Sequence, residues 1–334
     1  MGNPMTTKRR SIRTTKKSRE KLLKSVNLHL NPNNRFFCVG PLIHKGGPGK
    51  TTTLRMLASF IARYVCPNIP DGQPKKLLIV DLDPQLNTTS YYLDPAMISK
   101  QIDVDGIKRK EVTVGPAEGD EPSSIYDLFD PKLLQHPLLY PTAISEYIDI
   151  VPGSGAGFQA LEKVPLSQEK AYVDAFVDWT HSDDVKDEYI GVLIDTPPST
   201  NILAKLALHA YTDVYIPFEV GESNDDGVDN ASSMIQTAKI NRPTDKPTLN
   251  MIGLIANKVQ ENAVITDVTI QDYKNDPVYG ASFIPFMIPQ TINFKDLENP
   301  DNGTLFDNDL MDNKVLQSMI DASRHMARSM GLIL

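Results

Sequence analysis

Cysteine is scarce in this chain of 334 residues, which contains only two, Cys38 and Cys66. Two cysteines so far apart exclude a disulfide framework and a zinc site made of four cysteines. No apolar run approaches the roughly 18 residues that a membrane-spanning helix needs. No apolar stretch follows the charged N-terminus, as a secretory signal would require. We therefore expect a cytoplasmic protein in a reducing compartment.

Charge is unevenly distributed along the chain. The formal net charge is −8, but residues 1–24 carry nine lysines and arginines and a single acid, Glu20, which gives +8. The remaining residues therefore carry −16. A basic arm on an acidic body is typical of contact with nucleic acid or an anionic surface. A solvated tail that only keeps the protein soluble would have the same composition, so charge alone leaves both interpretations open.

Composition divides the chain into an arm and one domain. Residues 1–34 are polar and basic and end in the turn-like sequence Asn-Pro-Asn-Asn. We expect them to form a flexible arm, with ordered structure from Arg35 onward and a single domain over residues 35–334. Residues 95–122 are rich in glycine, proline and charge, and we expect a surface insertion there.

Short apolar runs alternate with helical patterns through this domain. The runs are almost continuously apolar, which is typical of strands buried on both faces of a parallel sheet. The alternation predicts an α/β fold with a doubly wound, mostly parallel sheet flanked by helices. The predicted strands are 36–43, 77–80, 148–151, 191–194, 214–218, 251–256 and 282–284; predicted helices include 51–64, 201–209 and 313–328.

The most informative segment, residues 44–53, follows the first predicted strand and opens a predicted helix. Glycines at positions 46, 47 and 49 allow the backbone N–H groups to approach phosphate oxygens closely. Lys50 can neutralise the β- and γ-phosphates, and Thr51 can offer its hydroxyl to Mg²⁺. His44 stands where the standard phosphate loop has glycine, so the loop is a variant with Lys45 as an additional cation. The alternative is a glycine-rich turn that binds no ligand.

Three motifs in order resemble those of one family. Residues 45–52 read K-G-G-P-G-K-T-T, residues 81–87 read D-L-D-P-Q-L-N, and residues 195–199 read D-T-P-P-S. The chain therefore resembles the ParA/MinD group of deviant Walker A ATPases over about residues 36–290, and within it the ParA partition ATPases. The resemblance implies the P-loop NTPase fold and binding of ATP with Mg²⁺.

The resemblance also implies roles for single residues. Asp195 would bind Mg²⁺ and Asp83 would position the attacking water, while Lys45 would reach the nucleotide of a partner subunit. Asp81 either supports the loop or metal, or caps backbone N–H groups at the strand end. The implied sets are Lys45, Lys50 and Asp83 for catalysis; Lys45, Gly46, Gly47, Pro48, Gly49, Lys50, Thr51, Thr52 and Asn257 for nucleotide; and Thr51, Asp83 and Asp195 for metal.

Base recognition is predicted from the segment Asn257-Lys258-Val259-Gln260. It is similar to the N-K-x-D box of guanine-nucleotide proteins, but Gln260 stands where the guanine-reading aspartate would be. The sequence therefore favours ATP over GTP, with Asn257 as the candidate contact to adenine. An asparagine in a loop after a strand, without a ligand, is the alternative.

For the whole protein, the resemblance implies a weak ATPase stimulated by a partner. ATP would drive a sandwich homodimer that binds DNA non-specifically on the nucleoid, and a ParB-like or other adaptor would trigger hydrolysis to position a plasmid, chromosome or other cargo. One departure bears on DNA: Gln290 and Asn293 stand where ParA proteins often carry arginines. The basic arm, with Lys314, Arg324 and Arg328, can compensate for that loss.

Two other functions use the same scaffold. A MinD-like ATPase at the membrane surface needs an amphipathic C-terminal helix; residues 323–334 lack aromatic anchors and are better explained as the helix that closes the domain. An iron–sulfur reductase is excluded because Cys38 lies in the first predicted strand and Cys66 at the end of the first helix. A metabolic ligase similar to dethiobiotin synthetase is not favoured, since D-x-D-P-Q is not its signature.

Overall fold

A computed structural model describes residues 16–43, 47, 49–93, 99–104, 107–112, 123–130, 136–220, 225–243, 246–259, 264–290, 303–307 and 311–334. Its centre is a 7-stranded sheet in the order β5-β6-β2-β7-β1-β8-β9. Every pairing is parallel except that of the edge strand β5 with β6. The predicted fold class, a doubly wound and mostly parallel α/β sheet, is confirmed. The strands are β1 (Phe37–Pro41), β2 (Lys76–Asp81), β5 (Tyr140–Pro141), β6 (Ile148–Val151), β7 (Tyr189–Asp195), β8 (Asp213–Glu219) and β9 (Asn250–Asn257).

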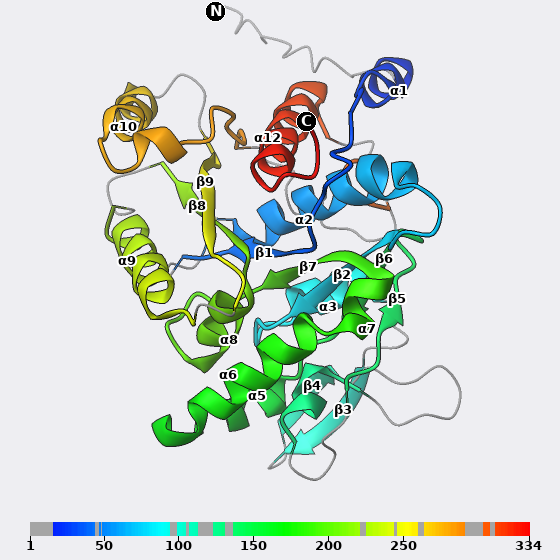
Figure 1. The fold of residues 1–334 in the computed structure, drawn as a ribbon, viewed down its shortest axis with the longest axis vertical. Coiled ribbons are helices and arrows are strands. Elements are labelled where there is room, and N and C mark those ends of the chain that lie inside the picture. Colours follow the sequence, from blue (N-terminus) through cyan, green and yellow to red (C-terminus); the bar gives the residue numbers. More distant parts are fainter. Residues whose placement is uncertain are drawn as a thin grey trace, which may run out of the picture.

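Helices cover both faces of this sheet, with α2 and α12 on one side and α5, α6 and α8 on the other (Figure 1). Alternate residues of one strand enter different cores, because successive side chains of a strand point to opposite faces. Leu77 and Ile79 of β2 pack in the core with α2 and α12, whereas Leu78 and Val80 pack in the core with α6 and α8. The helices are α1 (Lys16–Lys24), α2 (Lys50–Phe60), α3 (Asn87–Tyr92), α5 (Gly155–Leu161), α6 (Leu166–Thr180), α7 (Asp183–Glu188), α8 (Ile202–Ala210), α9 (Asp225–Asn241), α10 (Val264–Asn275) and α12 (Asn313–Ser329).

Two predicted elements differ from those observed. The predicted helix 51–64 is divided, because α2 ends at Phe60 and a π-helical turn, Ile61–Val65, continues the same path. The sequence predicts a strand at 282–284, but this run makes only an isolated bridge between Phe283 and Leu254. An apolar run this short does not allow the sequence to distinguish a strand from a buried loop.

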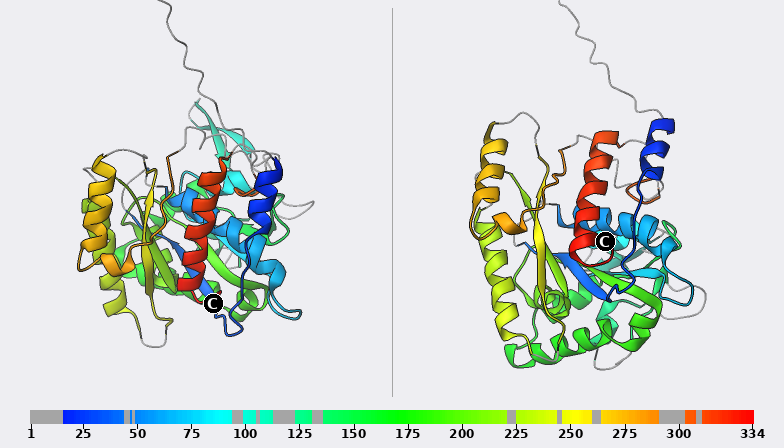
Figure 2. Two further views of the ribbon diagram at one scale, coloured as in Figure 1. Left: turned by 90° about the horizontal axis from the view of Figure 1, so that it is seen from above. Right: turned by 45° about the horizontal axis from the view of Figure 1, so that its top comes forward.

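The N-terminal segment is the main correction to the predicted organisation. Ordered structure does not begin at Arg35, since α1 lies beside α12 in both views of Figure 2. Arg19 is 5% exposed and donates to the backbone oxygens of Met311 (3.1 Å) and Phe306 (2.5 Å). Leu23 is buried in the same core as α12. Composition alone predicts a polar arm here, because lysines and arginines are numerous in the segment. Among its described residues, only Arg19 and Leu23 are buried, and two positions do not change the average.

The predicted insertion 95–122 contains a regular element. Strands β3 (Ser99–Val104) and β4 (Ile107–Val112) pair antiparallel in a separate two-stranded sheet. Residues 94–98, 105–106 and 113–122 lie outside the described part of the chain.

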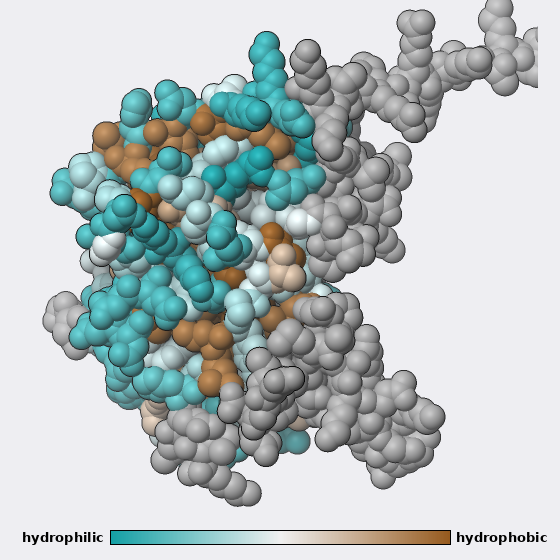
Figure 3. All heavy atoms as spheres, turned by 90° about the vertical axis from the view of Figure 1, so that its right-hand side faces the viewer, coloured by the Kyte–Doolittle hydropathy of each residue, from teal (hydrophilic) through white to brown (hydrophobic). Residues whose placement is uncertain are grey.

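The C-terminal helix closes one core, as expected. Its apolar side chains are buried, and Leu316, Met319 and Met326 are fully buried. None of the helices that the structure describes is long and apolar enough to cross a membrane. The residues that Figure 3 draws in colour are largely hydrophilic on this face, with hydrophobic residues in patches between them.

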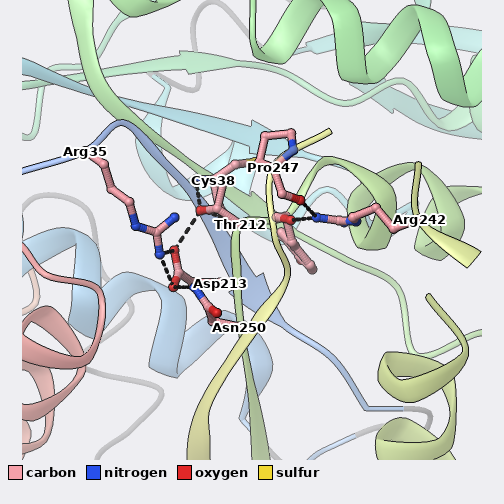
Figure 4. A network of polar contacts seen from close by, with 8 residues as sticks. Arg35, Cys38, Thr212, Asp213, Arg242, Pro247 and Asn250 are labelled. Carbon is pink, nitrogen blue, oxygen red and sulfur yellow. Dashed lines mark hydrogen bonds and ion pairs between the residues drawn. The ribbon is translucent and has the colours of Figure 1, made fainter. Parts of the chain in front are cut away.

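Polar side chains tie together the edge of the sheet where β8 begins and α8 ends (Figure 4). Arg35 donates to Asp213 Oδ1 at 2.7 Å, and Thr212 Oγ1 donates to Asp213 Oδ2 at 2.7 Å. Arg242 donates to the backbone oxygens of Tyr211 and Pro247 through Nη1. The polar side chains at this edge therefore bond one another and nearby backbone oxygens. The residues that the sequence predicts to bind nucleotide lie at the opposite, carboxyl edge of the sheet.

Candidate nucleotide site

Gly47 and Gly49, which belong to the phosphate loop, lie at the carboxyl edge of the sheet, after the end of β1. The loop connects β1, which has β7 on one side and β8 on the other, to the first residue of α2. In doubly wound sheets, this point of reversed strand order is where ligands bind. Gly47 (φ 98°) and Gly49 (φ 90°) both have left-handed backbone conformations, which favour glycine. The remaining loop residues, His44, Lys45, Gly46 and Pro48, lie outside the described residues.

Lys50 and Thr51 open α2 and face two carboxylates. Lys50 is 7% exposed. Burial lowers the pKa of Lys50, while the negative charges of Asp195 and Asp83 act to raise it. Thr51 Oγ1 donates to Asp195 Oδ2 at 2.8 Å. Thr52, also predicted to contact nucleotide, is half-buried on the same turn.

Asp195 and Asp81 end the neighbouring strands β7 and β2 and are paired in register. Both are fully buried. Burial, and then the charge of Asp195, raises the pKa of Asp81. Asp81 accepts hydrogen bonds from Asp83 N (3.0 Å), Thr89 N (2.8 Å) and Thr89 Oγ1 (2.7 Å). The sequence leaves two interpretations of Asp81 open, and these hydrogen bonds bear on both. The carboxylate caps the backbone N–H groups of Asp83 and Thr89, and in doing so it holds the loop that carries Asp83.

Asp83 lies on that loop and is 8% exposed. Its Oδ1 accepts a hydrogen bond from Gln85 N at 2.9 Å. Burial raises the pKa of Asp83; the Gln85 N–H and the Lys50 charge oppose this shift, and the Asp195 charge adds to it. The structure therefore brings Asp83 into the electrostatic field of both Lys50 and Asp195.

The end of β9 lies against the phosphate loop. Asn257 is 1% exposed, and a Cβ on Gly49 would lie 1.6 Å from its Nδ2. Its Oδ1 accepts from Lys258 N at 2.9 Å. The predicted adenine contact is thus a buried side chain that touches the loop itself, and its role toward the base stays a prediction. Gln260, from which the sequence favours ATP over GTP, lies outside the described residues.

Lys258 is a residue for which sequence reasoning gives no role. It has a left-handed backbone (φ 53°), which is uncommon for a side chain other than glycine. Its Nζ lies 3.3 Å from Glu219 Oε2 and 3.8 Å from the point where a Cβ on Gly47 would stand. The box Asn257-Lys258 is the available signal, but only the fold shows that the lysine reaches the phosphate loop.

Thr88 is a second residue that the sequence does not single out. It is fully buried near the start of α3, and its Oγ1 donates to Asp195 Oδ2 at 2.6 Å. Its neighbour Thr89 bonds Asp81, as above. Both threonines directly follow the D-x-D-P-Q-x-N motif, and their position just outside the motif is the only signal that the sequence contains.

The oxygen donors around Asp195 suit a hard divalent cation. The described residues contain no cluster of three or more His, Cys, Asp or Glu side chains that could hold a metal by themselves. Mg²⁺ needs no such cage, because it is usually held by one or two carboxylates together with water and substrate phosphates. The Asp195 carboxylate and the Thr51 hydroxyl, 2.8 Å apart beside the phosphate loop, fit that requirement.

Comparison with known proteins gives matches over most of the chain. A family model described as AAA domain matches residues 42–251. The chromosome partitioning protein ParA of Myxococcus xanthus is 26% identical over 245 residues, which are 72% of this chain and 70% of that protein. Among solved structures, the ATP complex of a single-residue variant of Cyanothece McdA has a TM-score of 0.65 at 15% identity, covering 90% of this chain and 98% of that one. Cobyrinic acid a,c-diamide synthase from Mycobacterium smegmatis, bound to an ATP analog and magnesium, has a TM-score of 0.51 at 20% identity, covering 81% and 93%.

Proposed function

The chain belongs to the AAA-domain family that its residues 42–251 match and is a ParA-type ATPase; from this premise we propose that it binds ATP with Mg²⁺ and uses hydrolysis to partition or position a DNA-linked cargo. The observation that carries the proposal is the convergence of Lys50, Thr51, Asp83 and Asp195 at the carboxyl edge of the sheet. A buried cation, a metal-ligand pair and a separate carboxylate are the parts that phosphoryl transfer requires.

Each part has a stated task in hydrolysis. The glycines of the loop and the first N–H groups of α2 receive the phosphate chain, and Lys50 neutralises charge on the β- and γ-phosphates. Thr51 and Asp195 would hold Mg²⁺, which would supply neutralisation of negative charge on the phosphates. Asp83 accepts a hydrogen bond from the attacking water and orients it toward the γ-phosphorus. Lys45 contributes a further cation to the nucleotide of a second copy of the chain.

The proposed cellular cycle rests on the resemblance to ParA partition ATPases. ATP joins two copies as a sandwich dimer that binds DNA non-specifically, and an adaptor of the ParB kind accelerates the slow intrinsic hydrolysis that returns the chain to monomers. The protein acts in the cytoplasm, associated with the nucleoid. Similarity to the M. xanthus partitioning protein supports this cycle.

Of the two alternatives, the structure weakens the membrane-surface ATPase. A membrane-surface ATPase would need an apolar helix face for the bilayer, but the apolar face of α12 is packed into the core. A metabolic enzyme remains compatible with the fold, since the cobyrinic acid a,c-diamide synthase likeness at 20% identity concerns the fold alone. The three motifs, and not the fold, favour partition.

Sedimentation with non-specific duplex DNA tests the proposal. We expect binding with ATP and Mg²⁺ but not with ADP or without nucleotide, and a weaker complex at the higher of two salt concentrations. The Asp83→Ala variant should retain ATP-dependent binding while losing hydrolysis. Absence of DNA binding in every nucleotide state, with ATP-dependent dimerisation intact, would contradict the DNA part of the proposal.

A truncation tests whether the basic N-terminal segment contributes to DNA binding, and it must leave α1 intact. Removing residues 2–15 deletes Lys8, Arg9, Arg10 and Arg13 but keeps α1, whose Arg19 is part of the packed body. We expect weaker DNA binding and a shallower dependence of log affinity on log salt, because fewer phosphates are contacted. An unchanged slope would exclude these four cations from the DNA interface.

A further inference from the structure

Two hydroxyl groups converge on a single oxygen of Asp195. Thr51 Oγ1 donates to Oδ2 at 2.8 Å, and Thr88 Oγ1 donates to the same atom at 2.6 Å. The other oxygen, Oδ1, accepts from the backbone N–H of Thr196 at 3.1 Å. Asp195 and Thr88 are both fully buried. The orientation of the carboxylate is therefore set by three donors, of which only Thr51 belongs to the phosphate loop and its helix.

Thr88 also connects Asp195 to the loop of Asp83. Thr88 lies near the start of α3, directly after the segment that carries Asp83, and Thr89 bonds Asp81 on the adjacent strand. Asp81 in turn accepts from the N–H of Asp83. Two consecutive threonines thus join α3 to two carboxylates that are paired in register on β2 and β7.

We propose that Thr88 is a positioning residue for the Mg²⁺ site, acting through Asp195; this inference rests on the proposed function. The Thr51 hydroxyl donates its hydrogen to Asp195, which leaves the lone pairs of Thr51 Oγ1 directed toward a cation. The Thr88 hydroxyl keeps the carboxylate in the orientation that makes this possible. Outer partners of this kind commonly change metal affinity by about 10- to 100-fold when removed.

The inference predicts a specific change in metal binding. Thr88→Val removes the hydroxyl at nearly constant volume, and Thr88→Ser retains it. In the full-length protein with ADP, we expect the Kd for Mn²⁺, measured by electron paramagnetic resonance, to rise about 10- to 100-fold in Thr88→Val. Thr88→Ser should restore Mn²⁺ affinity to within about 3-fold of the wild type. ADP affinity in excess EDTA should be unchanged in both variants.

The matched control is Thr237→Val, because Thr237 donates to Ser233 O on the exposed surface of α9. It should leave Mn²⁺ and ADP binding at wild-type values. Thermal unfolding of each variant identifies a loss of folding, and Thr88→Ala replaces Thr88→Val if the valine is not accommodated.

The possible failures are distinguishable. Wild-type Mn²⁺ affinity in a folded Thr88→Val or Thr88→Ala protein would overturn the inference alone. An equal loss of ADP affinity with metal and with EDTA would also overturn it, since the hydroxyl would then support the fold of the loop and not the metal. Absence of metal-dependent nucleotide binding in the wild type would overturn the proposed function and this inference together.

Discussion

Replacing Arg242 with alanine should destabilise the protein without touching the nucleotide site. Its guanidinium donates to the backbone oxygens of Tyr211 (2.7 Å), Pro247 (2.6 Å), Leu208 (2.7 Å) and His209 (2.9 Å). Leu208 and His209 lie in the last turn of α8, where carbonyl groups have no partner within the helix. One side chain just after the end of α9 therefore caps α8 and fixes the turn that leads into β9.

The magnitude follows from these contacts. Hydrogen bonds to a charged group contribute about 1.5–3 kcal/mol each, but Arg242 is only partly buried, so water replaces part of what is lost. We take about 3 kcal/mol for Arg242→Ala and about 2 kcal/mol for Arg242→Lys, whose single ammonium cannot span the same carbonyls. An unfolding entropy of about 2.1 cal/mol/K per residue gives about 0.7 kcal/mol/K for 334 residues. The expected fall in Tm for Arg242→Ala is therefore about 4 °C.

Differential scanning calorimetry of the full chain without nucleotide measures this shift. Lys246→Ala is the matched control, since Lys246 is a cation in the same region that pairs with the exposed Asp178 at 2.8 Å. An exposed pair of this kind contributes about 1 kcal/mol or less, so its Tm should fall by less than about 2 °C. Equal Tm values for Arg242→Ala and the wild type would refute the capping argument.

Three further predictions concern the loop, α1 and pH. Gly49→Ala should weaken ADP binding at least about tenfold in a fluorescence titration, because its Cβ would meet Asn257 Nδ2 in a backbone conformation that costs other residues about 1–2 kcal/mol; wild-type affinity would contradict this loop geometry. Arg19→Ala should lower the unfolding free energy by about 2 kcal/mol in urea, because two backbone oxygens lose their donor; an unchanged midpoint would show that these two hydrogen bonds do not contribute to stability. Burial lowers the pKa of His181, so on acidification the unfolded chain takes up this proton before the folded chain does, and the contribution of His181 to the free energy of unfolding should fall as pH drops below about 6.5. Urea titrations at several pH values should therefore show a smaller loss of stability on acidification for His181→Gln than for the wild type, and an identical pH dependence would contradict the assignment.

The fold is predictable because its strands are nearly continuous apolar runs. Buried parallel strands leave a strong signal, and the runs 77–80 and 148–151 correspond to β2 and β6 almost residue for residue. The N-terminal helix leaves no such signal, since Arg19 and Leu23 are two buried positions in a segment dominated by lysine and arginine. Composition describes the average polarity of a segment. Whether a segment packs on the domain depends instead on single side chains that contact residues far along the chain, as Arg19 contacts Met311.

The candidate site is predictable only as far as its motifs extend. Lys50, Asp83 and Asp195 stand in short patterns whose chemistry requires those residue types at those spacings, and the structure brings the three together.

Thr88 and Thr89 stand just outside the patterns and bond Asp195 and Asp81, and Lys258 pairs with Glu219. These contacts join residues 107 positions apart for Thr88 and Asp195 and 39 positions apart for Lys258 and Glu219. No spacing rule connects such positions, because the sheet order and not the chain order places β7 and β8 beside β1, and β2 beside β7. A threonine after a motif becomes informative only when the strand that carries its partner is known. If the Thr88 hydroxyl tunes the metal site, then chains with the same three motifs will differ in Mg²⁺ affinity according to this one position.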